Sequence, residues 1–282
     1  MKPAPFRYER PGSLEQAIEM LGDAEAKVLA GGQSLVPMMA MRLARPSVLV
    51  DLGAVPGLDG IERQNGELVT GAMVRQRALE RRPELAREVP LVAAALPDVG
   101  HREIRNRGTV GGSLAHADPA AELGLVAAVL EATVVTCGAE GPREIPASEL
   151  FVGPFQTALR DGELLTAVRW PTARSGDGFA FAEIARRHGD FALCGVAVQV
   201  RRESVRVGLL GVGPVPVVDE VAGGFDGVDR VGETARELAE RLEPADDMHA
   251  SAGYRRRLAR VLVERCLRRA IDDALDRAGG AR

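Results

Sequence analysis

Two glycine-rich stretches, far apart in the chain, constrain its fold more than any other feature. The first is Ala30-Gly31-Gly32-Gln33-Ser34-Leu35, and the second runs from 108 to 113 as Gly-Thr-Val-Gly-Gly-Ser. Glycine reaches positive φ and lets a backbone approach a ligand with no Cβ in the way. Consecutive peptide N–H groups with a helix start behind them form an anion site. Two such stretches therefore predict a ligand with two phosphates, such as a dinucleotide.

The elements predicted around each stretch support this reading. A strand at 27–30, the first stretch, a helix at 35–43 and a strand at 48–52 follow one another in a small α/β unit. Open α/β sheets usually hold ligands at the carboxyl ends of their strands, which is where this stretch lies. The second stretch leads to an apolar helical pattern that we expect to begin at Pro119 and to end near Leu130.

A polar stretch near the middle of the chain divides the remaining predicted helices and strands between two domains. Residues 172–178, TARSGDG, are polar and glycine-bearing, so we place the boundary there, between domains at 1–175 and 176–282. Asn65-Gly66 predicts a hairpin turn. The other expected elements are helices at 14–21, 85–96, 234–242 and 253–278, and strands at 60–63, 67–71, 133–137, 164–171, 179–200 (a pair around a turn at 189–190) and 205–212.

Composition excludes several classes of protein. The formal net charge is −4 and aromatic residues make up 4% of the chain, which argues against nucleic-acid binding. The three cysteines are far apart, so they suggest neither a disulfide framework nor a metal or cluster site. No apolar run is long enough for a transmembrane segment, and the N-terminus lacks the apolar core of a signal peptide. We therefore expect a cytoplasmic protein.

Both stretches also resemble the flavin-binding loops of the FAD-carrying medium subunit of molybdenum hydroxylases, the carbon monoxide dehydrogenase and xanthine dehydrogenase family. The resemblance is carried by AGGQSL, by HREIRNRGTVGGSLAHADPAAEL and by ARRHGDFALCGVA. It implies an α+β fold, with a two-lobed PCMH-type FAD-binding domain whose lobes span about 1–56 and 57–175. A C-terminal domain of the carbon monoxide dehydrogenase flavoprotein type, a small antiparallel sheet with a helical bundle, would follow.

The resemblance implies non-covalent FAD between the lobes, with its diphosphate at the two stretches. Asp118 and Glu122 would accept hydrogen bonds from ribose or ribityl hydroxyls; alternatively they are charges at a helix start. Leu164 or Leu165 would pack on the cofactor; alternatively both are strand core. The predicted cofactor-binding residues are Leu29, Ala30, Gly31, Gly32, Gln33, Ser34, Leu35, His101, Thr109, Val110, Gly111, Gly112, Ser113, Asp118, Glu122, Leu164 and Leu165.

We predict no catalytic side chain and no metal ligand in this chain. His101 and His116 would tune the reduction potential of the flavin or relay protons. Alternatively, each forms a hydrogen bond with the backbone of the loop. Neither has a serine or cysteine partner in a triad-like pattern, and no HExxH motif is present. Many relatives carry a lysine shortly before the paired arginines, where this chain has Glu183, so a lysine–flavin contact is not expected here.

The implied function is electron transfer by a subunit of a larger oxidoreductase. Electrons would arrive from a molybdopterin large subunit through an iron–sulfur small subunit, and FAD would pass them to an external acceptor. The three subunits would form a heterotrimer that can dimerise. Two alternatives stay open: a self-contained FAD-dependent oxidoreductase acting on its own small substrate, and a non-enzymatic nucleotide-binding assembly module.

Overall fold

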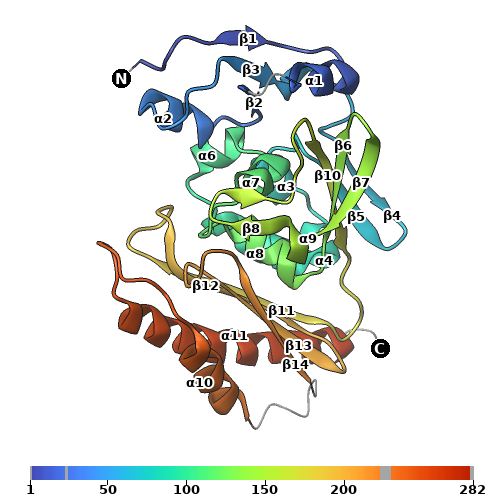
Figure 1. Cartoon of the computed structure of the whole chain (residues 1–282). Helices are drawn as coiled ribbons and strands as arrows, with labels where there is room; N and C mark the ends of the chain where they lie inside the picture. Colours follow the sequence, from blue (N-terminus) through green and yellow to red (C-terminus); the bar gives the residue numbers. More distant parts are fainter. Residues whose placement is uncertain (1, 23–24, 223–229, 280–282) are drawn as a thin grey trace.

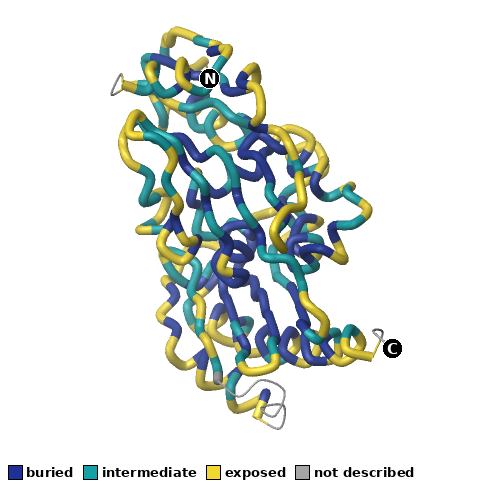
Figure 2. Tube along the Cα trace, turned by 90° about the vertical axis from the view of Figure 1, so that its right-hand side faces the viewer, coloured by how far each residue is buried: buried dark blue, intermediate teal, exposed yellow. Residues whose placement is uncertain are grey.

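The structure, a computed structural model, describes residues 2–22, 25–222 and 230–279. These residues form three tiers, an N-terminal lobe, a central lobe and a C-terminal domain (Figure 1). The buried part of the chain is concentrated in the lower two tiers, and the N-terminal lobe is mostly exposed or half-buried (Figure 2). The fold is α+β, as predicted.

The N-terminal lobe contains a small parallel sheet with strand order β1-β3-β2. Its core residue Val50 is fully buried. Ser13 caps the first helix by accepting a hydrogen bond from the Gln16 amide, as its position before an apolar helical pattern predicts. The elements are β1 (Arg7–Glu9), α1 (Leu14–Met20), β2 (Ala26–Leu29), α2 (Leu35–Ala40), β3 (Val48–Asp51) and η1 (Leu52–Ala54).

The central lobe is built on a five-stranded antiparallel sheet with order β4-β5-β10-β6-β7. The Asn65-Gly66 hairpin is confirmed, with positive φ at both residues. The strands are β4 (Ile61–Gln64), β5 (Glu67–Gly71), β6 (Thr133–Gly138), β7 (Gly141–Pro146), β10 (Leu164–Pro171) and the separate pair β8 (Phe151–Gly153) and β9 (Gln156–Thr157). The helices are α3 (Gln76–Glu80), α4 (Leu85–Glu88), α5 (Pro90–Ala95), η2 (Leu96–Asp98), α6 (Arg102–Arg107), α7 (Val110–His116), α8 (Glu122–Val129) and α9 (Ala147–Leu150).

The C-terminal domain is an antiparallel sheet of order β11-β12-β13-β14 with helices on one face, as predicted. Its opposite face packs on α5 and α8 of the central lobe. Strand β12 is consequently buried along its whole length, which explains its nearly continuous apolar sequence. The elements are β11 (Gly178–Ala185), β12 (Ala192–Val200), β13 (Ser204–Leu210), β14 (Val217–Ala222), α10 (Val231–Arg241) and α11 (Ala252–Gly279).

Three predicted helices differ from those observed. The helix expected at 85–96 is divided into α4, α5 and η2, because Pro90 lacks the N–H needed to continue a helix and starts a new one instead. The helix expected at 35–43 ends at Ala40. The helix expected to begin at Pro119 begins at Glu122.

Candidate ligand-binding cleft

A wide cleft opens between the three tiers. Its volume is about 2340 Å³, which exceeds the ~300–1,000 Å³ of typical small-molecule pockets. The cleft is lined by the first glycine stretch, part of the second, and two turns of the C-terminal domain at 189–193 and 211–214. An elongated ligand can therefore touch all three tiers at once.

The first glycine stretch turns sharply at the carboxyl end of β2. Gly32 has a φ of 74°, in the left-handed region that glycine adopts without strain. The amide of Val36 then donates to the Gly32 carbonyl at 3.1 Å as α2 begins. Within the described part of the chain, the amides of Gly32, Gln33 and Ser34 donate to no protein acceptor. Three adjacent donors are therefore available to an anion at this turn.

The two glycine stretches touch each other. A Cβ on Gly31 would lie 2.5 Å from the carbonyl oxygen of Arg107 and 2.8 Å from the Cα of Gly108. A Cβ on Gly112 would lie 3.3 Å from the Cβ of Ala30. Glycine at 31 is thus required because another backbone segment passes directly over it.

The second stretch is the first turn of α7 rather than an open loop. Thr109 caps this helix, and its Oγ1 accepts from the Gly112 amide at 3.0 Å. The amides of Val110 and Gly111 donate to carbonyls between β5 and α3, both at 2.9 Å. The expectation that these amides would bind phosphate is therefore wrong, because the protein's own acceptors already use them.

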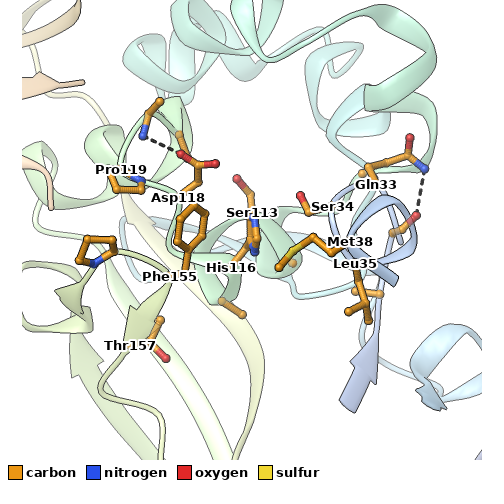
Figure 3. Close-up of a pocket in the computed structure, with 18 of the residues that line it drawn as sticks. Gln33, Ser34, Leu35, Met38, Ser113, His116, Asp118, Pro119, Phe155 and Thr157 are labelled. Atoms are coloured by element: carbon orange, nitrogen blue, oxygen red, sulfur yellow. Dashed lines mark hydrogen bonds between the residues drawn. The ribbon is translucent and has the colours of Figure 1, made fainter. Parts of the chain in front are cut away.

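The second stretch instead contributes a hydroxyl group. Ser113 and Ser34 both line the cleft, and Figure 3 shows their side chains directed into the same space. The Ser113 amide is used within the helix, donating to the Thr109 carbonyl at 3.1 Å. Among the residues that the structure describes, neither serine hydroxyl has a hydrogen-bond partner. The side chain of Gln33 donates back to the Gly31 carbonyl at 3.2 Å, which stiffens the first turn (Figure 3).

Two acidic residues lie on the cleft wall before and at the start of α8. Asp118 accepts from the Ala120 amide at 2.9 Å, in a turn that replaces the helix start expected at Pro119. Glu122 is the first residue of α8 and is only 7% exposed. Burial is the main cause that raises the pKa of Glu122 to about 8. Its carboxyl therefore carries a proton at neutral pH and can donate as well as accept a hydrogen bond.

The structure separates the predicted cofactor-binding residues into two groups. Those that line the cleft are Ala30, Gly31, Gly32, Gln33, Ser34, Leu35, Thr109, Gly112, Ser113, Asp118 and Glu122. Those outside its lining are Leu29, His101, Val110, Gly111, Leu164 and Leu165. Leu164 and Leu165 are buried in two different hydrophobic clusters, in agreement with their alternative reading as strand core. The ring of His101 lies instead beside that of His188, with 6.3 Å between centroids.

The cleft is also lined by residues outside the predicted cofactor-binding set, among them His116, which the sequence predicts only as a group that tunes the flavin or relays protons. The rings of His116 and Phe155 lie 5.2 Å apart between centroids, on the wall formed by α7 and the β8–β9 turn (Figure 3). Burial lowers the pKa of His116 below its ordinary value. Phe191 reaches the cleft from the C-terminal domain and is 73% exposed. The phrase ARRHGDFA predicted a turn at this position, but a turn pattern does not say which cavity the turn faces.

Arg255 connects the start of α11 to the cleft. Arg255 is 7% exposed, and its guanidinium donates to the carbonyls of Leu193 and Gly211, and to Asp247 at 2.6 Å. Gly211 in turn donates its amide to the Pro119 carbonyl at 3.2 Å. The C-terminal domain is thereby hydrogen-bonded to the segment that carries Asp118.

Within residues 2–22, 25–222 and 230–279, no cluster of three or more His, Cys, Asp or Glu side chains has the arrangement of a metal site. None of the helices in the same ranges has the length and apolar character needed to cross a membrane. Cys137, Cys194 and Cys266 are free thiols.

Comparison with known proteins gives matches along nearly the whole chain. Residues 4–173 match the family described as the FAD binding domain in molybdopterin dehydrogenase, and residues 179–270 match the CO dehydrogenase flavoprotein C-terminal domain. The nicotine 6-hydroxylase medium subunit of Paenarthrobacter nicotinovorans is 41% identical over 278 residues, covering 95% of this chain and 98% of the relative. The 6-hydroxypseudooxynicotine dehydrogenase complex subunit alpha of the same organism is 38% identical over 291 residues, covering 97% of both. Among solved structures, quinoline 2-oxidoreductase from Pseudomonas putida 86 matches with a TM-score of 0.91 and 35% identity, covering 98% of this chain and 100% of that one.

Proposed function

This chain belongs to the FAD-binding subunits of the molybdopterin dehydrogenases, and from that membership we propose that it is the electron-transfer link of a larger oxidoreductase. FAD is its cofactor, and oxidoreduction is the class of reaction in which it takes part. In the proposed route, electrons come from an iron–sulfur subunit and leave through FAD to an external acceptor. The flavin supplies the electron chemistry, and the protein supplies binding and orientation.

The three unpartnered amides at the first glycine stretch are the observation that carries this proposal. We place the diphosphate of FAD at Gly32, Gln33 and Ser34, where backbone donors offset its negative charge. The hydroxyls of Ser34 and Ser113 add donors from both sides of the cleft. Asp118 and Glu122 then face the ribose or ribityl hydroxyls from the start of α8. The residues present therefore fit the cofactor, although fewer backbone amides contribute than the sequence predicts.

The proposed partners are an iron–sulfur small subunit and a molybdopterin large subunit, in a heterotrimer that can dimerise. Relatives that match this chain over nearly their whole length bear names that describe a medium subunit and a subunit of a dehydrogenase complex. Among the described residues, no group of three or more His, Cys, Asp or Glu side chains is arranged to hold a metal. The described part of this chain therefore has no metal centre of its own to transfer single electrons, and that role falls to the partner subunit. The three free thiols support a reducing, cytoplasmic location.

Isolation of the tagged chain from its native host tests the proposal. We expect FAD, two further subunits, molybdenum and iron to co-purify in fixed ratio, and flavin reduction by substrate to require the complete complex. A chain that purifies alone with FAD and oxidises a small substrate would instead identify a self-contained oxidoreductase. A chain that binds nucleotide without any redox turnover, alone or in complex, would identify an assembly module.

A further inference from the structure

A buried glutamine lies on the cleft wall, outside the proposed diphosphate site. Gln76 is the first residue of α3, lines the cleft and is 4% exposed. Its Oε1 is buried and, among the residues that the structure describes, has no hydrogen-bond partner. Within the same residues its Nε2 has no acceptor either. A buried amide without partners is destabilising, so the position of this side chain requires an explanation.

Gln76 lies directly against the second glycine stretch. A Cβ on Gly108 would lie 2.5 Å from the Oε1 atom of Gln76 and 3.1 Å from its Cδ atom. The main-chain amide of Gln76 donates to the Gly108 carbonyl at 2.9 Å. The φ of Gly108 is −55°, so glycine is needed here for space rather than for backbone conformation. The absence of a side chain at 108 therefore makes room for the carboxamide of Gln76.

Apolar side chains lie beside Gln76 on this part of the cleft wall. Val99 follows η2 and Ile104 lies in α6, and both η2 and α6 pack on α3, which begins with Gln76. A Cβ on Gly108 would also lie 3.1 Å from the Ile104 carbonyl oxygen, so Gln76 and the main chain of Ile104 both lie against Gly108. Val99 and Ile104 line the cleft, with exposed fractions of 8% and 37%. The polar amide of Gln76 therefore has mainly apolar surroundings.

The 189–193 turn of the C-terminal domain reaches the same part of the cleft. A Cβ on Gly189 would lie 2.4 Å from ring atoms of His101, which follows Gly100 on the cleft wall. Phe191, two residues further along this turn, also lines the cleft and is largely exposed. We call the space between these segments the Gln76 recess, and its lining consists of Gln76, Val99, Gly100, Ile104, Gly108 and Phe191.

The Gln76 recess suits the isoalloxazine ring of FAD better than the adenine ring. Isoalloxazine is apolar at its dimethylbenzene end and polar at its pyrimidine edge, where an N–H lies between two carbonyl groups. A carboxamide can donate to such a carbonyl oxygen and accept from such an N–H, and apolar walls suit the rest of the ring. Adenine offers a comparable donor and acceptor but has polar nitrogens around its whole perimeter. The wall beyond Ser113 carries more polar groups, at His116, Asp118 and Thr157, and suits adenosine better (Figure 3).

We propose, on the premise that FAD occupies this cleft as proposed above, that the carboxamide of Gln76 binds the pyrimidine edge of the isoalloxazine ring. Oε1 accepts from the ring N–H and Nε2 donates to the neighbouring carbonyl oxygen, so both atoms gain the partners that the protein does not provide. Reduction adds negative charge to this edge of the ring, and a hydrogen bond to an oxygen that gains charge becomes stronger. Gln76 therefore binds reduced flavin more tightly than oxidised flavin and raises the midpoint potential of the cofactor.

The experiment compares Gln76→Met with Gln199→Met by titrating each apo chain with FAD, FMN and ADP, which separates the two halves of the cofactor. Methionine is also unbranched, and its side chain has no N–H or C=O group. Gln199 is the matched control, because it is 3% exposed and its Oε1 also lacks a partner in the described part of the chain, but it does not line the cleft. For Gln76→Met we expect the Kd for FAD and for FMN to rise roughly 3-fold to 10-fold, as for one hydrogen bond of ordinary strength. The Kd for ADP should stay unchanged.

A redox titration of the FAD-loaded chain gives a readout that a purely structural role would not change. The midpoint potential of Gln76→Met should be lower than that of Gln199→Met. Each factor of ten in the lost preference for reduced flavin corresponds to about 30 mV for a two-electron couple. If Gln76→Met does not fold, Gln76→Glu decides the question: it keeps the size of the side chain, and a carboxylate should lower the potential because it repels the negative charge of reduced flavin.

The outcomes separate this inference from the proposed function. Unchanged affinities together with an unchanged midpoint potential would overturn the role of Gln76 while leaving FAD binding and electron transfer intact. A weaker affinity for ADP with an unchanged affinity for FMN would also overturn it, because the amide would then face the adenosine half. A wild-type chain that binds neither FAD nor FMN would overturn the proposed function, together with the inference that rests on it.

Discussion

Replacement of Gly31 by alanine tests whether contact between the two glycine stretches creates the FAD site. The added methyl would lie 2.5 Å from the Arg107 carbonyl oxygen. Ordinary van der Waals contact begins at 3.4 Å, so the two segments must separate by about 0.9 Å, the difference between these distances. Because the nearest obstacles are backbone atoms, no change of rotamer relieves the clash.

The size of the effect follows from the cost of overpacking. Steric insertion into a well-packed site costs ~1–3 kcal/mol. Separation of the segments moves the free amides of Gly32, Gln33 and Ser34 away from Ser113. Because these groups are proposed to bind the same cofactor, we expect the steric cost to appear as weaker binding of FAD. Since 1.4 kcal/mol corresponds to a factor of ten, the Kd for FAD should rise roughly 5-fold to 150-fold.

The assay is a titration of the apo chain with FAD, followed by the change in flavin fluorescence, with thermal unfolding measured in parallel. Gly60→Ala is the matched control, because a Cβ there meets nothing within 4 Å and Gly60 does not have positive φ. We expect this control to bind FAD like the wild type. A Gly31→Ala chain that folds and binds FAD as tightly as the Gly60→Ala chain would refute the reasoning.

Three further results are expected. Ser113→Ala should weaken FAD binding by the ~0.5–1.5 kcal/mol of one hydrogen bond without lowering the melting temperature of the apo chain, as titration and thermal unfolding will measure. Arg105→Ala should lower the free energy of unfolding by ~1–3 kcal/mol in a denaturant titration, because Arg105 is only 7% exposed and the variant leaves the carbonyls of Val99 and Gly100 without this donor, while Glu80 keeps its ion pair with Arg77. Glu122→Gln should raise the melting temperature at pH 8 and leave it unchanged near pH 4.5. The folded pKa of Glu122, about 8, lies above its ordinary 4.5, so the wild type loses stability as pH rises through this interval, and glutamine has no proton to lose. Equal melting temperatures of wild type and variant at pH 8 would contradict this.

Features that depend on neighbouring residues could be predicted from the sequence. The Asn65-Gly66 turn, the Ser13 cap and the strands on either side of the 189–190 turn were all predicted, because turn chemistry, capping and periodicity act over a few residues. The family and its cofactor could likewise be inferred from three phrases of the sequence, two of which contain the glycine stretches, since a glycine turn that binds a diphosphate tolerates few other residues.

Features that depend on contacts between distant segments were decided by the tertiary structure. The amides of Val110 and Gly111 look available in the sequence, yet carbonyls from the segment after β5 already accept from them. The proton that Glu122 keeps is equally invisible along the chain, because it depends on the burial of this side chain at the start of α8. A linear sequence shows which groups can donate or ionise. Whether a donor is free, or a carboxyl keeps its proton, depends on competition for hydrogen bonds and exclusion of water, which exist only once the chain is folded.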